Sequence, residues 1–242
     1  MSVYTPSQFA MRDRVAIARL MHDYPFATLV TAATPEPFIS HLPLLLVAAP
    51  EPHGTLIGHM ARANPHWQHA AAGETIAIFH GPHAYVSPSW YAEPSKAVPT
   101  WNYAAIHAQG TLEVIYDAAE TRGVLDALVQ RFEGSRDSRG RAAPTREIRP
   151  LGGSEAAAAA SVGGSSGPWQ FAMSEPQRDA LVGAIVAFRL HIHRLTAKFK
   201  LSQNRPADDQ ARVAAALDNE GYADAASVAA WMRAYAGGVA GG

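Results

Sequence analysis

A ten-residue stretch places a basic side chain beside the start of a short predicted helix. The stretch runs from Gly58 to Trp67 and reads GHMARANPHW. Asn64 is a favourable helix cap, and Pro65 suits the first helical position. Because a guanidinium and a helix N-terminus both attract anions, Arg62 and this corner suit a phosphate group. The alternative is that Arg62 is a solvated or ion-paired surface residue.

Other chemistry-bearing residues form weaker patterns. No glycine-rich Walker or dinucleotide fingerprint is present, which argues against nucleotide sites of those classes. Serine hydroxyls occur without a nucleophile elbow or a pair of placed carboxylates, so a hydrolase has no specific support. Histidines form three close pairs, but none lies in a His-Glu-x-x-His pattern, and we expect no metal site. The pairs are His66 and His69, His80 and His83, and His191 and His193.

The run from Val98 to Tyr116 is read as one long strand, because it is rich in β-branched and aromatic residues. Its alternate residues give two mixed faces. Such a wall of aromatic and hydrogen-bonding groups suits a flat, partly polar ligand or a subunit contact. The alternative is an amphipathic strand whose Trp and Tyr side chains anchor the core. One face carries Trp101, Tyr103, His107 and Gln109, and the other carries Thr100, Asn102, Ala104, Ile106 and Ala108.

Short β-type runs must position these residues. They are separated by Pro, Gly, Asn and Glu at the spacing typical of an antiparallel barrel or sandwich. A later run over 184–196 alternates apolar with polar residues and continues toward Arg205. The earlier runs cover 26–32, 38–47, 55–61, 75–80, 84–87 and 100–116.

Helical patterns flank the strands. Ser7 is expected to cap a helix that Pro25 ends, and Asp117 with Glu120 opens a second amphipathic helix. Two further helices close the chain, one over 207–218 and one that ends at Gly237.

The composition bounds the class of protein. The chain has 242 residues, 48% hydrophobic and 17% charged, which is typical of a globular protein with a substantial core. It has no cysteine, which excludes disulfides, thiolate metal sites and cysteine nucleophiles. The formal net charge of -1 gives no overall attraction to nucleic acid. No signal peptide or apolar run long enough for a membrane span is present, so we expect a cytoplasmic protein.

We expect four segments along the chain. Residues 1–133 form the N-terminal part of the barrel, 134–167 a flexible loop or linker, 168–205 a strand returning to the barrel, and 206–242 a C-terminal helical extension. The linker is inferred from the tract between Gly152 and Gly167, which has too few large apolar residues to offset the entropy of ordering.

Six short motifs occur in order between residues 1 and 218. They read YTP at 4–6, SHLP at 40–43, GHMARANP at 58–65, YVSPSWY at 85–91, VPTWNY at 98–103 and KLSQNR at 200–205. Together they resemble the PaiB family of bacterial FMN-binding proteins, which are described as negative transcriptional regulators. The tract over 152–167 and the final Ala-rich helix depart from the family pattern, and they bear on partners more than on the fold.

This resemblance implies an antiparallel FMN-binding split β-barrel, a mainly β fold with peripheral helices (α+β). It also implies a homodimer with FMN in the groove between the two subunits. Carried over by position, Arg62 and Asn64 would lie near the FMN phosphate. The ring side would be lined by Thr100, Trp101, Asn102 and His41, together with Lys200 and Gln203 of the partner subunit.

The resemblance also implies a flavin-binding regulator or sensor without steady turnover. The alternative is a flavin-dependent oxidoreductase that acts on a small substrate in the same groove, with no catalytic residue assigned. A direct DNA-binding repressor has the least support, because the two terminal helices carry only Arg212 and Arg233 as basic residues. A regulatory effect would then act through a partner protein or indirectly.

Overall fold

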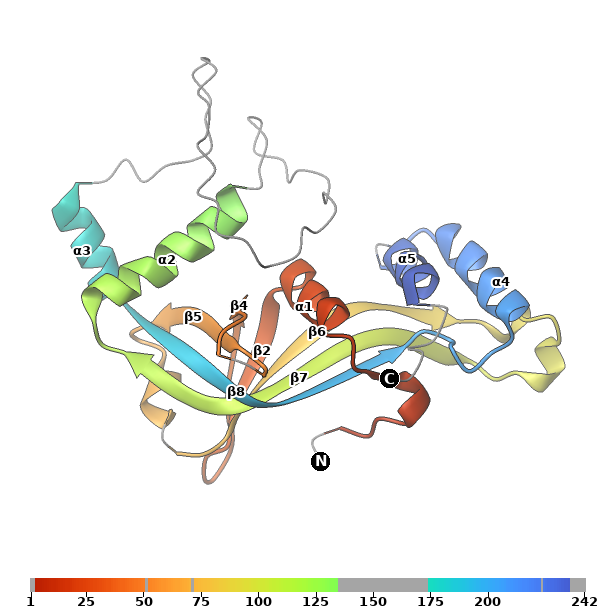
Figure 1. The fold of residues 1–242 in the computed structure, drawn as a ribbon, viewed down its shortest axis with the longest axis horizontal. Coiled ribbons are helices and arrows are strands. Elements are labelled where there is room, and N and C mark those ends of the chain that lie inside the picture. The colour runs from red at the N-terminus through yellow and green to blue at the C-terminus, as the bar shows by residue number, and fades with distance from the viewer. Residues whose placement is uncertain (1–2, 51, 71, 135–173, 223, 236–242) are drawn as a thin grey trace, which may run out of the picture.

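The chain is organised around one curled antiparallel sheet. The computed structural model describes residues 3–50, 52–70, 72–134, 174–222 and 224–235. The eight-stranded sheet has the order β3-β2-β6-β7-β8-β5-β4, and β1 pairs with β8 (Figure 1). The predicted mainly β fold with an antiparallel barrel and peripheral helices is confirmed. The strands are β1 (Ala10–Met11), β2 (Phe26–Thr31), β3 (Phe38–Pro43), β4 (Leu45–Val47), β5 (Thr55–Ala61), β6 (Thr75–Val86), β7 (Thr100–Ile115) and β8 (Ile185–Lys200).

Two strand boundaries differ from the sequence prediction. The run over 38–47 is divided at the buried Leu44, whose amide N–H donates to the Pro25 carbonyl instead of to a neighbouring strand. The runs over 75–80 and 84–87 form one strand, because a bulge between His80 and His83 carries the pairing with β7 past Gly81. A Cβ atom at Gly81 would lie 2.8 Å from Leu20 Cδ1, so the bulge requires glycine for close packing.

The first helix begins later than predicted. Residues Ser7–Phe9 form a 3-10 turn, η1, and β1 follows it. Helix α1 (Arg14–Asp23) is capped by Asp13, whose carboxylate accepts from the Val15 amide at 2.8 Å. The prediction of Ser7 as the cap is therefore wrong, because the intervening residues pair with β8.

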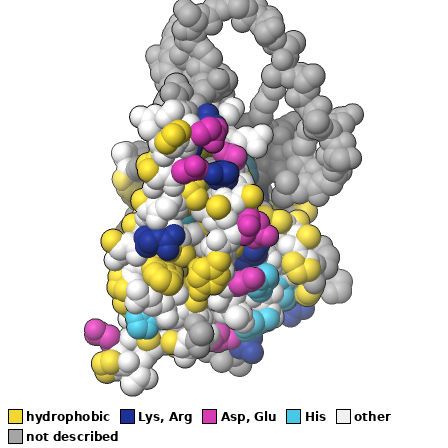
Figure 2. All heavy atoms as spheres, turned by 90° about the vertical axis from the view of Figure 1, so that its left-hand side faces the viewer, with side chains coloured by type: hydrophobic (Ala, Val, Ile, Leu, Met, Phe, Trp, Pro, Cys, Tyr) yellow, Lys and Arg dark blue, Asp and Glu magenta, His cyan; other side chains and the backbone are white. Residues whose placement is uncertain are grey.

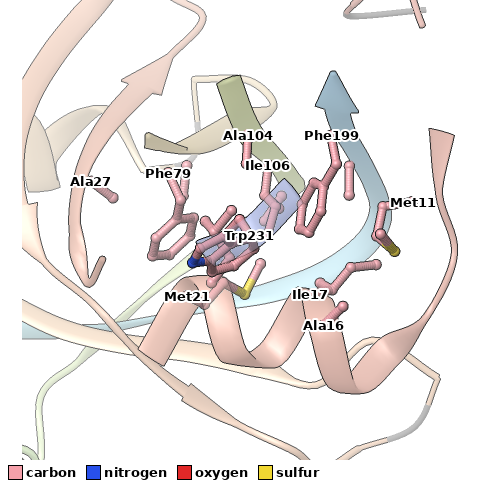
Figure 3. Packing of buried hydrophobic residues seen from close by; sticks show 14 of the residues in the cluster. Met11, Ala16, Ile17, Met21, Ala27, Phe79, Ala104, Ile106, Phe199 and Trp231 are labelled. Carbon is pink, nitrogen blue, oxygen red and sulfur yellow. The ribbon is translucent and has the colours of Figure 1, made fainter. Parts of the chain in front are cut away.

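Alternate strand side chains fill the barrel interior and continue into a core at one end of the sheet. Figure 3 shows part of this core, where Phe199 of β8 packs against Trp231 with ring centroids 5.2 Å apart. Trp231 lies on α5 (Ala225–Tyr235), which packs against α4 (Ala207–Asp218). These two helices lie over the far ends of β6, β7 and β8 (Figure 1). We call this end of the sheet the arm.

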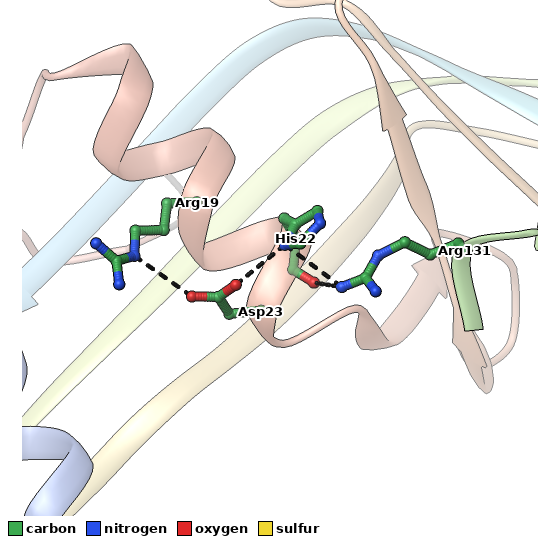
Figure 4. Close-up of polar contacts among 4 residues, drawn as sticks. All are labelled: Arg19, His22, Asp23 and Arg131. Atoms are coloured by element: carbon green, nitrogen blue, oxygen red, sulfur yellow. Dashed lines mark hydrogen bonds and ion pairs between the residues drawn. The ribbon is translucent and has the colours of Figure 1, made fainter. Parts of the chain in front are cut away.

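Helices α2 (Ala118–Glu133) and α3 (Glu175–Gly183) lie at the opposite end from the arm (Figure 1). Asp117 caps α2 as predicted, since its carboxylate accepts from the Glu120 amide at 2.8 Å. The last turn of α2 is attached to α1, because Arg131 Nη2 donates to the His22 carbonyl at 2.7 Å (Figure 4). The barrel end and α1 are thus joined by a polar contact as well as by the core.

Two further predictions from the sequence concern the linker and membrane-spanning segments. The predicted loop or linker over 134–167 lies outside the described residues except for Gly134, and the four-segment division stays a prediction. Among the helices of the described residues, none is long and apolar enough to cross a membrane.

Candidate functional site

At the arm, an ammonium group is held against the start of β7. Lys200 Nζ donates to Thr100 Oγ1 at 2.5 Å and to the Trp101 carbonyl at 2.6 Å. Burial lowers the pKa of Lys200, and the neighbouring charges of Lys198 and Arg205 lower it further. An anion placed here would relieve the repulsion among these three cations.

Asn102 and Gln203 hold the turn that follows Lys200. Asn102 is 1% exposed, and its Nδ2 donates to Ser202 Oγ at 2.9 Å. Ser202 has a φ of 66°, a left-handed backbone that such local contacts stabilise. Gln203 Nε2 donates to the Phe199 carbonyl at 2.6 Å, and its Oε1 accepts from the Leu201 amide at 2.7 Å. Both predicted flavin contacts therefore have structural partners within the chain, and their contact with FMN stays a prediction.

Strand β7 has one buried and one outward face. Its side chains Asn102, Ala104, Ile106 and Ala108 are buried, whereas Trp101 on the other face is 51% exposed. Trp101 stands beside Tyr85 and His83 of β6, with ring centroids 6.3 Å and 6.1 Å away. The interpretation of Trp101 as a core anchor is therefore wrong, and an outward aromatic surface remains for a ligand or a subunit.

This outward surface extends across four strands. The register places His41, Thr28, Ile78 and His107 in one row across β3, β2, β6 and β7. Phe26 is 64% and Ile39 52% exposed on the same side of the sheet, which is unusual for such large apolar residues clustered together. We call this surface the open face. Its residues are Phe26, Thr28, Ile39, His41, Ile78, His80, His83, Tyr85, Trp101, Tyr103 and His107.

Histidines supply the polar groups of the open face. His41 Nδ1 lies 3.1 Å from Thr28 Oγ1. His107 Nδ1 is buried without a hydrogen-bond partner, and burial together with the nearby His80 lowers the pKa of His107. An unpartnered buried ring nitrogen is uncommon in a complete structure. A polar ligand atom or a second subunit at this face would satisfy it.

The predicted phosphate corner lies at the opposite end of β8 from Lys200. Arg62 Nε donates to the Gly183 carbonyl at 2.6 Å, and Nη2 donates to the Ile185 carbonyl at 2.7 Å. These bonds fix the junction between α3 and β8. Asn64 caps η2 (Pro65–His69) as predicted, since its Oδ1 accepts from the His66 amide at 3.1 Å. The side-chain partners of Arg62 in the described residues are these backbone carbonyls, and the residue is exposed, which agrees with the alternative of a solvated surface arginine. A contact with a phosphate stays a prediction.

A buried polar chain holds η2 to the barrel. His66 is 0% exposed, with Nδ1 2.8 Å from Ser40 Oγ and Nε2 2.8 Å from Thr31 Oγ1. Asn64 Nδ2 donates to Ser40 Oγ at 2.9 Å, and Thr31 Oγ1 lies 2.7 Å from Thr75 Oγ1. Burial lowers the pKa of His66 to about 4, and the adjacent His69 contributes. A neutral imidazole therefore links hydroxyl groups of β2 and β3.

Sequence reasoning missed His59, the second residue of the GHMARANP motif that contains Arg62 and Asn64. His59 lies on β5 with a buried Nδ1 that has no hydrogen-bond partner, and burial lowers its pKa. The available signal was its place on the strand that leads into Arg62 and Asn64. A neutral imidazole with an unused nitrogen can donate to or accept from a ligand, depending on its tautomer.

The histidine pairs have other partners. His83 Nδ1 lies 3.2 Å from Asp224 Oδ2, His191 contacts Glu113, and His193 contacts Glu74. Within the described residues, no group of three or more metal-ligating side chains comes together.

One chain does not bring all predicted flavin residues together. Arg62 and Asn64 lie near the start of β8, His41 lies on the open face, and Lys200 lies at the end of β8. The strand has sixteen residues. At about 3.3 Å per residue, its ends are roughly 50 Å apart along the strand. A ligand the size of FMN cannot touch both ends within one chain.

Comparisons with known proteins identify the type of fold and cofactor. A family model described as "Putative FMN-binding domain" matches residues 3–194. The chain is 29% identical to the Bacillus subtilis "Protease synthase and sporulation protein PAI 2" over 95% of this chain and 96% of that protein. An uncharacterized protein of Aspergillus fumigatus is also 29% identical, over 80% of this chain and 82% of its own length.

Solved structures share the fold at low sequence identity. A protein described as the FAD and heme binding protein from Mycobacterium smegmatis has a TM-score of 0.53 and 18% identity, with 84% of this chain and 78% of that chain covered. The flavocytochrome Anf3 from Azotobacter vinelandii has a TM-score of 0.54 and 13% identity, with 81% and 72% covered. The split-barrel fold predicted from the motifs is confirmed.

Proposed function

Since the chain belongs to the PaiB-type family of FMN-binding split-barrel proteins, we propose that it is a flavin-dependent regulatory protein whose FMN lies between two copies. The cofactor follows from the family. The regulatory role and the dimer are proposals, supported by the name of the Bacillus relative and by the geometry of the open face.

The placement of the predicted site residues carries the dimer proposal. In the proposal, a second copy brings the arm of one chain toward the phosphate corner of the other, because Lys200 and Arg62 lie at opposite ends of β8 within one chain. The open face also has the exposed aromatic and aliphatic side chains that a subunit interface would bury, such as Phe26, Ile39 and Trp101. The unpartnered nitrogens of His107 and His59 fit a site completed by another molecule.

The residues of this site bind and orient the cofactor in the proposal. In the proposal, His41 on β3, His59 on β5 and Trp101 on β7 belong to one subunit, and Lys200 comes from the arm of the partner subunit. Asn64, at the start of η2, lies on the side of the phosphate. FMN supplies electron transfer when it is bound. Lys200 provides positive charge, and Trp101 provides a flat apolar surface for the ring. Arg62 keeps its predicted place near the phosphate only as a prediction, because two of its N–H groups already donate to carbonyls.

A direct DNA-binding role receives no support from the terminal helices. Arg233 on α5 pairs with Asp218, and α4 begins with the acidic residues Asp208 and Asp209. With Arg233 paired, Arg212 is the remaining basic residue of α4 and α5, and one such charge is less than a recognition helix carries. The proposed regulation therefore acts through a partner protein or through the redox state of the flavin.

An absorbance spectrum of freshly purified protein between about 350 and 500 nm tests the cofactor, and sedimentation velocity tests the dimer. The proposal expects flavin bands or quenching of added FMN fluorescence, together with a dimeric mass. A colourless monomer that ignores micromolar FMN would contradict it.

The second candidate is a flavin-dependent oxidoreductase acting in the same groove. The exposure of Trp101 in the single chain favours it only in a dimer that leaves this ring uncovered, because a flavin stacked there would then be accessible to a small substrate. Steady oxidation of NADH or NADPH by the FMN-loaded protein with an added acceptor would support the enzyme. Reduction of the bound flavin without turnover would support the regulator.

A further inference from the structure

A pocket of about 550 Å³ lies between α2, α3 and the adjoining ends of β7 and β8. This volume is within the range of sites that enclose small organic molecules. Figure 2 views the molecule from this end, where apolar side chains surround a few basic and acidic groups. None of the residues that define the open face lines this pocket.

The pocket has an excess of positive charge. Arg62 and Arg122 both line it, and Asp179 is its one carboxylate among the described lining residues. Asp179 pairs with Arg122. Arg62 has no carboxylate partner in the described part of the chain, and its two bonds to carbonyls leave Nη1 available. The wall therefore presents one oriented guanidinium whose charge is not neutralised.

The remaining walls are mainly apolar. Val114 and Val186 come from the barrel strands, and Val182 comes from α3. Trp67 also lines the pocket, and its indole N–H donates to the Arg62 carbonyl at 3.1 Å, which holds the ring to the backbone of Arg62. A guanidinium held in one orientation beside apolar walls matches a ligand with one planar anionic group and an apolar body.

We propose that this pocket binds a small amphipathic carboxylate, with the carboxylate on Arg62 and the apolar body against the valine walls. This proposal assigns Arg62 to the carboxylate and not to the FMN phosphate, so the pocket is then a site separate from the proposed FMN groove. FMN also carries an anionic head, so the test must separate a free carboxylate from the flavin phosphate.

Calorimetric titration of the full-length protein with 2-naphthoate tests the proposal, with and without saturating FMN. The expected dissociation constant is about 1 mM or lower, because a ligand of this size gains only modest affinity from burial. Neutral 2-naphthamide has the same ring system and should bind at least about tenfold more weakly. Equal affinity for the acid and the amide would overturn the proposal, as would no binding of naphthoate at several times this concentration.

Two variants locate the binding. Val182→Trp fills the pocket and should abolish naphthoate binding while FMN affinity is unchanged. Arg62→Met should weaken naphthoate at least about tenfold and remove the preference for acid over amide. Arg212→Met, on α4 far from the pocket, is the matched control and should behave like the unmodified chain.

The same variants distinguish failure of this proposal from failure of the FMN proposal. Loss of FMN binding in Val182→Trp, or displacement of FMN by naphthoate, would assign the pocket to the flavin and overturn the separate site. If Val182→Trp does not give a cooperative thermal melt, the test relies on Arg62→Met, in which the ratio of the affinities for 2-naphthoate and 2-naphthamide is measured. A ratio unchanged from that of the unmodified chain would then overturn the proposal.

Discussion

The outer surface of the barrel differs between its two halves. Over β5 and β8, Val124 and Leu128 of α2 pack against Ile57 and Ala187, and together they form a second small core. Over β2, β3, β6 and β7, the equivalent outward residues form the open face, where Ile39 is 52% exposed. The same alternation of strand residues thus gives a core where the described residues supply a helix, and an exposed apolar surface where they supply none. The difference supports the proposal that a second copy covers the open face.

Crossed substitutions in the two halves give the largest expected effects. Ile39→Lys should weaken dimerisation by about 3 kcal/mol, roughly a hundredfold, because it buries an unpaired charge in the proposed interface. Its effect on the free energy of unfolding of the monomer should stay within about 0.5 kcal/mol. Leu128→Ala should do the reverse, lowering the free energy of unfolding by about 2 to 4 kcal/mol through a cavity under α2.

Sedimentation velocity and urea unfolding measure the two quantities on the same samples. If Ile39→Lys unfolds the chain, or leaves its association unchanged, the two halves do not differ as proposed. Ile39→Val is the matched control for the open face and should alter neither quantity appreciably.

The pH dependence of stability compares the contacts that hold the two halves of the barrel. The folded pKa of His66 is about 4, against an ordinary value of 6.5. Because the folded protein binds this proton less tightly than the unfolded chain, stability is full above pH 6.5 and falls as the pH drops toward 4. Linkage predicts a loss of about 2 kcal/mol at pH 5. The lowered pKa values of His59 and His107 add to the loss in the same direction.

Urea unfolding at pH 7.5 and pH 5 checks the total, and His66→Gln isolates the share of this residue. That variant should be less stable at pH 7.5 but should lose distinctly less stability on acidification. Hydrogen exchange should show faster opening of β2 and β3 than of β8 and α2 at pH 5. Uniform opening would mean that the buried chain of hydroxyls does not hold the open half.

The fold was predictable because its signals are local. Asp117 and Asn64 cap their helices as the sequence indicates, since a side-chain acceptor is recognisable from its place before an apolar run. Ser7 fails as a cap because pairing of Ala10 with Lys198 takes precedence, and that contact joins residues far apart in the sequence. The gap predicted between the runs over 75–80 and 84–87 is a bulge within one strand, where a Cβ atom at Gly81 would crowd Leu20.

The site was only partly predictable, because a motif indicates neither the face to which each side chain points nor the distance between motifs in the fold. Trp101 and Asn102 are adjacent in one motif, but their side chains point to opposite faces of β7. Arg62 and Lys200 both have the charge that a phosphate requires, yet they lie at opposite ends of β8. His59 carries no local signal apart from its strand, and only its unpartnered nitrogen brings it to attention.

Removal of the arm's cation should have a smaller effect than loss of the interface. Lys200→Met is expected to weaken FMN binding by about 1.5 kcal/mol, roughly tenfold, through loss of one charge-assisted contact. Fluorescence titration of FMN measures it. Lys96→Met removes an exposed cation that pairs with Glu93, and it should leave the affinity unchanged. Equal affinity in both variants would remove Lys200 from the proposed site and leave the open face without contribution from the arm.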